Sequence, residues 1–327
     1  MTFYLYAETA FHHEGDKDYL FKLIDEAKEA GCHGVKFQVL IELNEFMSSK
    51  HAAYSQVKNW LFSFNEWVEV LSYTKKQGLD IVLMPLDIEA LKLVELFDVK
   101  YIEVHSVSFN DLKLLTSIKG VKLPLVFGVG GRTAEEIDRV VKQYNDRNVV
   151  LMVGYQSFPS ELVDIKLERI SALLCKYPDC QLGYADHSSF DDEMAIISND
   201  YAYVLGARIF EKHIAIEEGK ERTDWQSAVS GDKIKRVIER LNYLSKVFGW
   251  KKESLFEIDG KEKTYRDRQK VPVATVDIAA GTIVSDDLIS LKMTSDANIV
   301  DSTNLIVGKE LINNIEKDKP FSKQDFL

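Results

Sequence analysis

The sequence contains few cysteines. Only Cys32, Cys175 and Cys180 occur among its 327 residues, and an odd, sparse set of this kind does not form the disulfide framework of a small secreted domain. A metal site built on Cys175 and Cys180 would lack the second pair of ligands that completes such sites. We therefore expect a reducing, cytoplasmic environment.

Positive charge is also in the minority. The 41 Lys and Arg residues face 52 Asp and Glu residues, which gives a net charge of −11. Because an acidic chain repels nucleic acid and anionic lipid, we expect neither as a general partner. An anionic substrate is still compatible with this composition, since a few local cations can line a pocket.

Long apolar runs are absent from the sequence. The opening stretch MTFYLYAETA lacks the features of a signal peptide, and no run is apolar for long enough to span a membrane.

Short apolar runs alternate with longer amphipathic segments. Eight runs rich in β-branched and aromatic residues predict strands, and each is followed by a helical pattern. The predicted strands are residues 2–8, 32–40, 80–86, 100–106, 123–129, 148–154, 180–186 and 207–213. This alternation predicts an α/β fold, a closed (β/α)8 (TIM) barrel. A doubly wound open sheet is the alternative, but the stretch AETAFHHEG after the first run has no G-x-G-x-x-G turn.

The pattern changes after Trp250. Residues 1–250 form the predicted barrel, which ends with a helix over 232–250. Residues 251–270 are polar and have no clear period, so we expect a linker there. From Val271 to Leu327 short strand patterns and turns at Ala280-Gly281 and Ser285-Asp286 predict a small β-rich domain.

Polar residues occupy the carboxyl ends of the predicted strands. In a barrel these ends and the loops after them form the active site, and an unpaired charge buried among apolar residues is costly. The position that they share therefore predicts a functional site. Its candidate members are Glu8, Lys36, Glu103, Ser106, Gln156, Glu211, and, in the loop after the eighth strand, Arg222 and Asp224.

Two histidines end adjacent predicted strands. Neighbouring strands lie about 4.8 Å apart, so the rings of His187 and His213 could reach one metal ion, for which neutral imidazole is a common ligand. Two structural histidines, hydrogen-bonded to Asp186 or Glu211, are the alternative. Spacing alone favours that alternative. The role of Lys36 is equally open at this point: it could form a structural ion pair with Glu8 or Glu211, or bind a substrate anion.

Several motifs along nearly the whole chain resemble those of the sialic acid (nonulosonic acid) synthase family. AETAFHHEGD resembles the family's A-E-I-G-x-N-H-x-G-D, and GCHGVKFQ resembles its G-A-D-A-V-K-F-Q. GYADHS is similar to G-Y-S-D-H-T, and LGARIFEKHIA to L-G-A-x-x-I-E-K-H-F-T. The tail resembles the family's antifreeze-like (SAF) domain in VATVDIAAGTIVSDDLI. The order of the motifs is that of the family.

The resemblance implies a C–C bond-forming transferase. Such enzymes condense phosphoenolpyruvate with an N-acylated amino sugar and use a divalent metal, Mn²⁺ or Mg²⁺. It implies that His187 and His213 are the metal ligands, that Glu8 and Glu211 lie near the reacting carbons, and that Lys36 binds phosphoenolpyruvate. Asp224 matches the acidic residue of the family's G-P-D-H loop. The resemblance also implies a homodimer in which the tail of one chain covers the barrel mouth of the other.

The chain departs from the family where phosphoenolpyruvate is expected to bind. The lysine of the strand-four motif K-I-A-S-G-D is replaced by Glu103, although Ser106 still matches. Hydroxyl-bearing residues of three further motifs are replaced by Met84, Gly128 and Ala185. A charge-assisted hydrogen bond contributes roughly 1.5–3 kcal/mol, so losing several should weaken the binding of a trianion.

Three interpretations follow from these departures. The first is a sugar-acid synthase with a rebuilt donor pocket, in which Lys36, Arg132 or Arg222 holds the phosphate. The second is an enzyme that keeps metal-assisted carbonyl chemistry and uses another donor, such as pyruvate. The third is a non-catalytic paralogue that binds a ligand or a partner subunit. The retained His187, Glu211 and His213 argue against the third, and the replacements Met84, Glu103, Gly128 and Ala185 argue against the first.

The predicted domain boundary can be tested by limited proteolysis. We expect the first cut between Lys251 and Lys270, because exposed polar segments between domains are the preferred sites of cleavage. Early cleavage inside the barrel helices would contradict the boundary.

Overall fold

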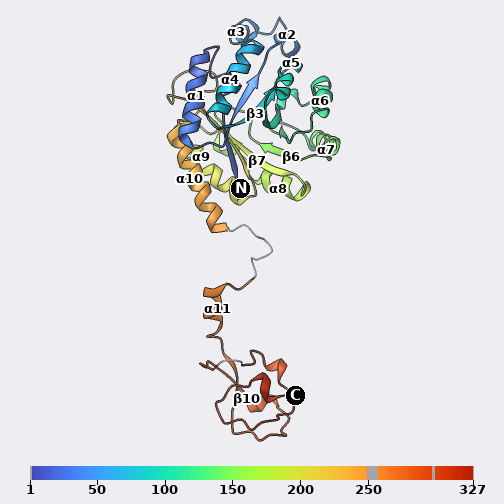
Figure 1. The fold of residues 1–327 in the computed structure, drawn as a ribbon, viewed down its shortest axis with the longest axis vertical. Coiled ribbons are helices and arrows are strands. Elements are labelled where there is room, and N and C mark those ends of the chain that lie inside the picture. The colour runs from blue at the N-terminus through green and yellow to red at the C-terminus, as the bar shows by residue number, and fades with distance from the viewer. Residues whose placement is uncertain (1, 249–256, 297–298, 327) are drawn as a thin grey trace. The chain divides into compact units, whose positions relative to one another are not determined.

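The computed structural model describes residues 2–248, 257–296 and 299–326. The chain divides into two compact units, Met1–Trp250 and Lys251–Leu327, which Figure 1 shows. Helix α11 (Gly260–Arg266) lies inside the segment that the sequence predicts as a linker. The linker bounds themselves stay a prediction.

The first unit is a closed barrel of eight parallel strands in the order β1 to β8, which confirms the predicted fold. All eight predicted strands are present. Their bounds are β1 Tyr4–Glu8, β2 Gly34–Val39, β3 Asp80–Pro85, β4 Val99–Val104, β5 Leu125–Gly128, β6 Val149–Val153, β7 Gln181–Asp186 and β8 Ile209–His213.

Helices follow the strands and surround the barrel (Figure 1). The longer ones are α1 Lys17–Ala30, α4 Phe64–Lys76, α6 Leu112–Lys119, α7 Ala134–Gln143, α8 Glu168–Lys176, α9 Met194–Val204 and α10 Gly231–Phe248. The short helices are α2 Leu43–Phe46, α3 Tyr54–Lys58 and α5 Ile88–Leu91. None of the described helices is long and apolar enough to cross a membrane.

Helix α1 shows how the sequence sets the ends of these helices. The side chain of Asp16 accepts a hydrogen bond from the backbone N–H of Tyr19 and so caps the N-terminus. Gly31 ends the helix with φ +85°, a left-handed conformation that glycine adopts without a steric penalty. Helix α8 is shorter than its sequence pattern: residues 162–177 have helical spacing, but the helix begins only at Glu168, because Lys166 takes a positive φ of +47°.

Side chains alternate between the two faces of each barrel strand. Residues two apart on a strand share a face, so Tyr6 and Glu8 of β1 point into the barrel while Ala7 packs against the helices. The inner face is filled mainly by aromatic and β-branched side chains below the polar strand ends. The alternation therefore places the charged residues of the carboxyl ends together inside the barrel mouth, next to the apolar core of the barrel interior.

The second unit has little regular structure. Strands β9 (Val271–Ala274) and β10 (Ile289–Lys292) pair antiparallel, and isolated bridges such as Ile278–Ile315 connect other segments. Its core includes Ala274, Ile306 and Phe321. The predicted turn at Ala280-Gly281 is present, with Gly281 at φ +84°.

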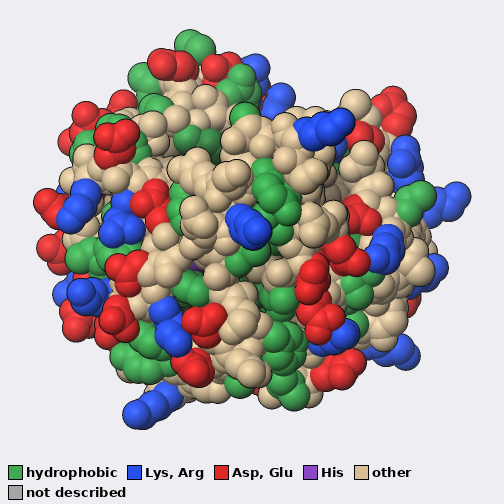
Figure 2. All heavy atoms as spheres, turned by 90° about the horizontal axis from the view of Figure 1, so that it is seen from above, with side chains coloured by type: hydrophobic (Ala, Val, Ile, Leu, Met, Phe, Trp, Pro, Cys, Tyr) green, Lys and Arg blue, Asp and Glu red, His purple; other side chains and the backbone are tan. Residues whose placement is uncertain are grey.

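The surface carries both signs of charge. On the face that Figure 2 shows, Lys and Arg side chains are interspersed with Asp and Glu side chains rather than gathered in one patch. A small anionic ligand would therefore have to be recognised by individual cations in cavities.

One charged pair is buried on the outer side of the barrel. Lys212 Nζ donates to Asp186 Oδ2 at 2.6 Å, and both side chains are fully buried. Burial alone would raise the pKa of Asp186, but Lys212 and hydrogen bonds from Ser188 hold this pKa below its ordinary value. Asp186 directly precedes His187 in the sequence, and Lys212 directly precedes His213. Although they are neighbours of the two cavity histidines, Asp186 and Lys212 form a structural pair.

We expect the variant Lys212→Met to lose about 3–5 kcal/mol of unfolding free energy, because it leaves the Asp186 carboxylate buried without its partner. Urea unfolding followed by circular dichroism measures the loss. The matched control Lys220→Met breaks an exposed pair with Glu217 and should cost at most about 1 kcal/mol. Equal effects of the two variants would show that the buried pair contributes no more than an exposed one.

Candidate active site

A cavity of about 340 Å³ opens at the carboxyl ends of the barrel strands. Of the ten residues that the sequence predicts for the site, eight line this cavity: Lys36, Glu103, Ser106, Gln156, His187, Glu211, His213 and Asp224. The barrel therefore brings together residues that are up to 188 positions apart, from Lys36 to Asp224.

Lys36 lies at the centre of a buried charge network. Its Nζ lies 2.7 Å from Glu211 Oε2, 2.9 Å from Glu103 Oε1 and 3.0 Å from Glu8 Oε2. All four side chains are at most 4% exposed. Nζ donates a hydrogen bond to Glu103 Oε1, and the contacts with Glu211 and Glu8 are ion pairs. Glu8 Oε2 has no hydrogen-bond partner among the described residues. Three carboxylates therefore crowd the one ammonium group, and a further anion beside it would meet their negative charge.

Three further groups contact the carboxylates of this network. The Tyr6 hydroxyl lies 2.8 Å from Glu103 Oε2 and 3.2 Å from Glu211 Oε2. Gln38 Nε2 donates to Glu8 Oε1 at 2.8 Å, and the backbone N–H of Ala10 donates to the same oxygen. Glu8 does not line the cavity itself; it contributes through Lys36.

Burial and the neighbouring charges shift the pKa values in this network. Burial raises the pKa of Glu103 to about 7; Lys36 opposes the shift, and Glu211 adds to it. Burial alone would lower the pKa of Lys36, but the attraction of Glu103 and Glu211 raises it above its ordinary value. Lys36 therefore stays charged, and its carboxylate partners outnumber it.

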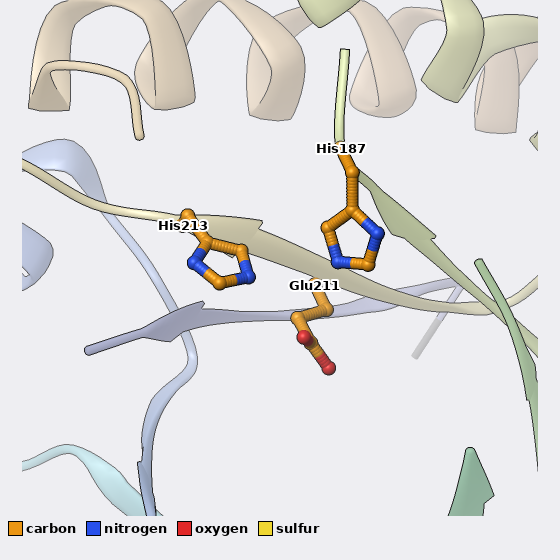
Figure 3. Close-up of side chains that lie close together, drawn as sticks. All are labelled: His187, Glu211 and His213. Atoms are coloured by element: carbon orange, nitrogen blue, oxygen red, sulfur yellow. The ribbon is translucent and has the colours of Figure 1, made fainter. Parts of the chain in front are cut away.

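His187, Glu211 and His213 offer ligand atoms that all lie within 4.8 Å of one another. Figure 3 shows these side chains side by side at the ends of β7 and β8. The Nδ1 of His187 lies 2.7 Å from the carbonyl oxygen of Tyr155. A carbonyl oxygen only accepts, so Nδ1 carries the hydrogen and Nε2 keeps a lone pair for a metal.

Both imidazoles are held neutral. Burial lowers the pKa of His187, and burial together with the neighbouring His187 and Lys36 lowers that of His213 well below its ordinary value. A neutral imidazole is the form that binds metal. Two neutral imidazoles and one carboxylate are a suitable ligand set for a divalent cation, so the residues fit the metal that the sequence predicts.

Asp224 reaches the cavity from the loop after β8. Its φ is +61°, in the left-handed region that non-glycine residues seldom adopt, so the loop holds this residue at some conformational cost. Burial raises the pKa of its carboxyl group. A raised pKa favours the protonated form of a carboxyl group, which is the form that donates a proton.

Arg222 does not line the cavity. Its guanidinium lies 3.9 Å from the centre of the Tyr19 ring, donates to the carbonyl oxygen of His12 and lies 3.8 Å from Glu14. These contacts hold together the loops after β1 and β8. The predicted role of Arg222 in substrate binding finds no support in this position.

The departures from the family motifs cluster in one part of the cavity. Met84, Glu103, Gly128 and Ala185 all line it. At Gly128 a Cβ atom would lie 3.4 Å from the backbone nitrogen of Ser106, so a side chain there would meet the one hydroxyl residue that is retained. The changes therefore remodel a single region, while the His187–Glu211–His213 group is intact.

Three polar residues of the site were absent from the predicted set: Tyr6, Gln38 and His105. Tyr6 joins two carboxylates, and the signal that could have found it is its spacing of two from Glu8, on the same face of β1. His105 lines the cavity, where burial lowers its pKa to about 4. Its Nδ1 accepts from the N–H of Val107, so Nε2 carries the hydrogen.

Comparisons with known proteins agree with this geometry. The NeuB family model matches residues 23–253, and the SAF domain model matches residues 270–327. The N-acetylneuraminate-9-phosphate synthase of Drosophila melanogaster is 27% identical over 97% of this chain and 94% of its own length. The pseudaminic acid synthase of Campylobacter jejuni is 21% identical over 99% of this chain and 96% of its own length.

Solved structures show the same fold. The spore coat polysaccharide biosynthesis protein E of Chromobacterium violaceum matches with a TM-score of 0.84 at 20% identity, over 99% of both chains. The N-acetylneuraminic acid synthetase of Leptospira borgpetersenii matches with a TM-score of 0.72 at 23% identity, over 82% of this chain and 92% of that one. With one family model covering most of the barrel and the other covering the predicted antifreeze-like tail, the chain belongs to the NeuB family, the sialic acid (nonulosonic acid) synthases.

Proposed function

We propose that this chain is a metal-dependent synthase that joins a three-carbon acid donor to the aldehyde of an amino sugar or another sugar. The observation that carries the proposal is one cavity in which His187, Glu211 and His213 lie close enough to hold a metal ion, beside a network of buried carboxylates. The relatives are named as synthases, which confirms the prediction of an enzyme of this type.

The metal site would supply one part of the chemistry. A divalent cation such as Mn²⁺ or Mg²⁺, held by His187, His213 and the free oxygen of Glu211, would polarise the carbonyl of the sugar. The tautomer of His187 is already set by Tyr155, so the ligand needs no rearrangement to present Nε2.

The remaining residues position the substrates and move protons. Gln38 and Ala10 fix Glu8, and Glu8 with Glu211 holds the ammonium of Lys36 in the wall of the cavity. We assign to Asp224 the role of proton donor to the oxygen of the acceptor aldehyde, because burial raises its pKa and it faces the cavity. Glu211, which lines the cavity, is the candidate base for the donor carbon, and Glu8 acts through Lys36.

The Lys36 network affects which donor the cavity can bind. The family resemblance implies phosphoenolpyruvate, but the one Lys in the described lining of the cavity is surrounded by three carboxylates. Since a phosphate group would meet the negative charge of these carboxylates there, this favours a donor without phosphate, such as pyruvate. Ser106 and Gln156 remain to bind its carboxylate.

A direct assay tests the function. The protein is incubated with Mn²⁺, a panel of N-acyl amino sugars, and either phosphoenolpyruvate or pyruvate, and sugar acids are identified by mass spectrometry. A sugar acid from one donor supports the proposal, and release of inorganic phosphate identifies that donor as phosphoenolpyruvate. The absence of any product from the whole panel would contradict the proposal.

Metal binding should depend on the two histidines. We expect one Mn²⁺ per chain, and His187→Ala or His213→Ala should weaken its binding by at least about 10–100-fold, because each removes a direct ligand. Titration calorimetry measures the affinity. The matched control His51→Ala changes an exposed histidine outside the cavity and should leave it unchanged. If both His187→Ala and His213→Ala bound Mn²⁺ as tightly as the unmodified protein, the two histidines would have a structural role only.

Donor choice should depend on Glu103. At about 4 Å and an effective dielectric near 20, two like charges repel by about 4 kcal/mol, so removing this carboxylate should favour a phosphorylated donor. We expect Glu103→Gln and Glu103→Lys to bind phosphoenolpyruvate at least about tenfold more tightly than the unmodified protein.

The measurement is calorimetric titration in the presence of Mn²⁺, with Glu221→Gln, an exposed charge change in the loop after β8, as the control. Tight binding by the unmodified protein that is lost in Glu103→Lys would show that another group holds the phosphate.

We further propose that the protein is a homodimer in the cytoplasm and that its partners are small-molecule sugar and three-carbon acid substrates. A monomeric mass at micromolar concentration by light scattering would contradict the homodimer.

A further inference from the structure

A second cavity, of about 230 Å³, lies outside the barrel strands between α7 and α8. The loop after β5 and the end of β6 form its floor, with Val129 and Val153, and Ile137 of α7 and Leu173 of α8 form apolar walls. Its volume is below the about 300–1,000 Å³ of sites for drug-sized ligands. The space suits a small metabolite.

Three cations line this cavity: Arg132, Arg169 and Lys176. None of the described residues in its lining is acidic. Lys176 pairs with Asp138 at 3.0 Å, and Arg132 lies 3.6 Å from Glu136, too far for a close hydrogen-bonded pair. Positive charge is therefore concentrated around an apolar space.

Arg132 has an unused donor. Its Nε is buried and has no hydrogen-bond acceptor among the described residues. A buried donor without an acceptor is costly, and such groups are uncommon in folded proteins. A ligand oxygen would satisfy it. Arg132 does not line the first cavity, so the position that the sequence suggested for holding a phosphate belongs to this second one.

The two cavities are neighbours with opposite electrostatic character. Gly154 lines both, and a Cβ atom on Gly130 would lie 2.2 Å from the carbonyl oxygen of Gly154, so the wall between them is close-packed backbone. The first cavity has one Lys, surrounded by carboxylates; the second has three cations and no carboxylate in its described lining. They are therefore suited to different ligands.

We propose that the second cavity binds a small organic anion with an apolar body, its phosphate or carboxylate group held by Arg132 and Arg169 and its body packed against the walls of α7 and α8. This site is independent of the proposed synthase reaction. Guanidinium groups recognise phosphate and carboxylate in a bidentate manner, and the apolar walls give the body of the ligand a place out of water.

The test uses the full chain and two probes, phenyl phosphate and inorganic phosphate, in calorimetric titration. Phenyl phosphate should bind at least about tenfold more tightly than inorganic phosphate, since only phenyl phosphate uses the walls. Arg132→Gln and Arg169→Gln should each weaken its binding by at least about tenfold, the change expected from losing one charge-assisted hydrogen bond.

Two variants serve as comparisons. Arg139→Gln removes the same charge from an exposed position of α7 that does not line the cavity, and it should leave binding unchanged. Ala172→Phe fills the cavity from an exposed position of α8 without changing its charge, and it should abolish phenyl phosphate binding. Four results would each overturn the proposal. The first two are no binding of phenyl phosphate, and binding that survives Ala172→Phe. The other two are equal effects of Arg132→Gln and Arg139→Gln, and equal affinity for the two probes.

Discussion

The active site depends on the ion pairs of Lys36 inside the barrel. A single ammonium group with three carboxylates is costly in a dry interior unless the remaining lone pairs find partners. Tyr6, Gln38 and the backbone of Ala10 donate to several of them, whereas Glu8 Oε2 has only its ion pair with Lys36. Removing any one carboxylate changes both the charge of the cavity and the donors that Lys36 can offer. A change in this network would therefore alter both the substrate preference and the stability of the barrel interior. Glu211 belongs to the Lys36 network and also to the metal-ligand set.

Alternation along the strands explains why catalytic and structural charges can be adjacent in sequence. On β8, Glu211 and His213 face the cavity while Lys212 faces outward to Asp186. The register pairs Ala185 with Glu211 and Asp186 with Lys212, so β7 follows the same pattern. Each outward ion pair helps to fix the strand whose inward residues form the site.

The barrel and most of its site could be predicted from sequence because both follow from local patterns. Strands covered on both faces are apolar almost throughout, and polar residues at their carboxyl ends must lie together once the barrel closes. Tyr6 escaped prediction because an aromatic residue on a strand is typical of core packing. The position of Arg222 outside the cavity lining could not be predicted, because the path of a loop depends on long-range contacts, here with Tyr19 and Glu14. The crowding of Lys36 by three carboxylates could not be predicted from sequence either, since it depends on side chains from β1, β2, β4 and β8 converging within 3.0 Å.

The hydrogen bond that orients His187 ends on a backbone carbonyl, that of Tyr155, rather than on a side chain. Every amino acid supplies the same carbonyl oxygen, so position 155 can change during evolution without altering the tautomer of the histidine. An insertion or deletion between Gly154 and Ser157 would instead move that oxygen. Related sequences should therefore vary in residue type at this position and be constant in loop length, a constraint that a search for invariant residues would overlook.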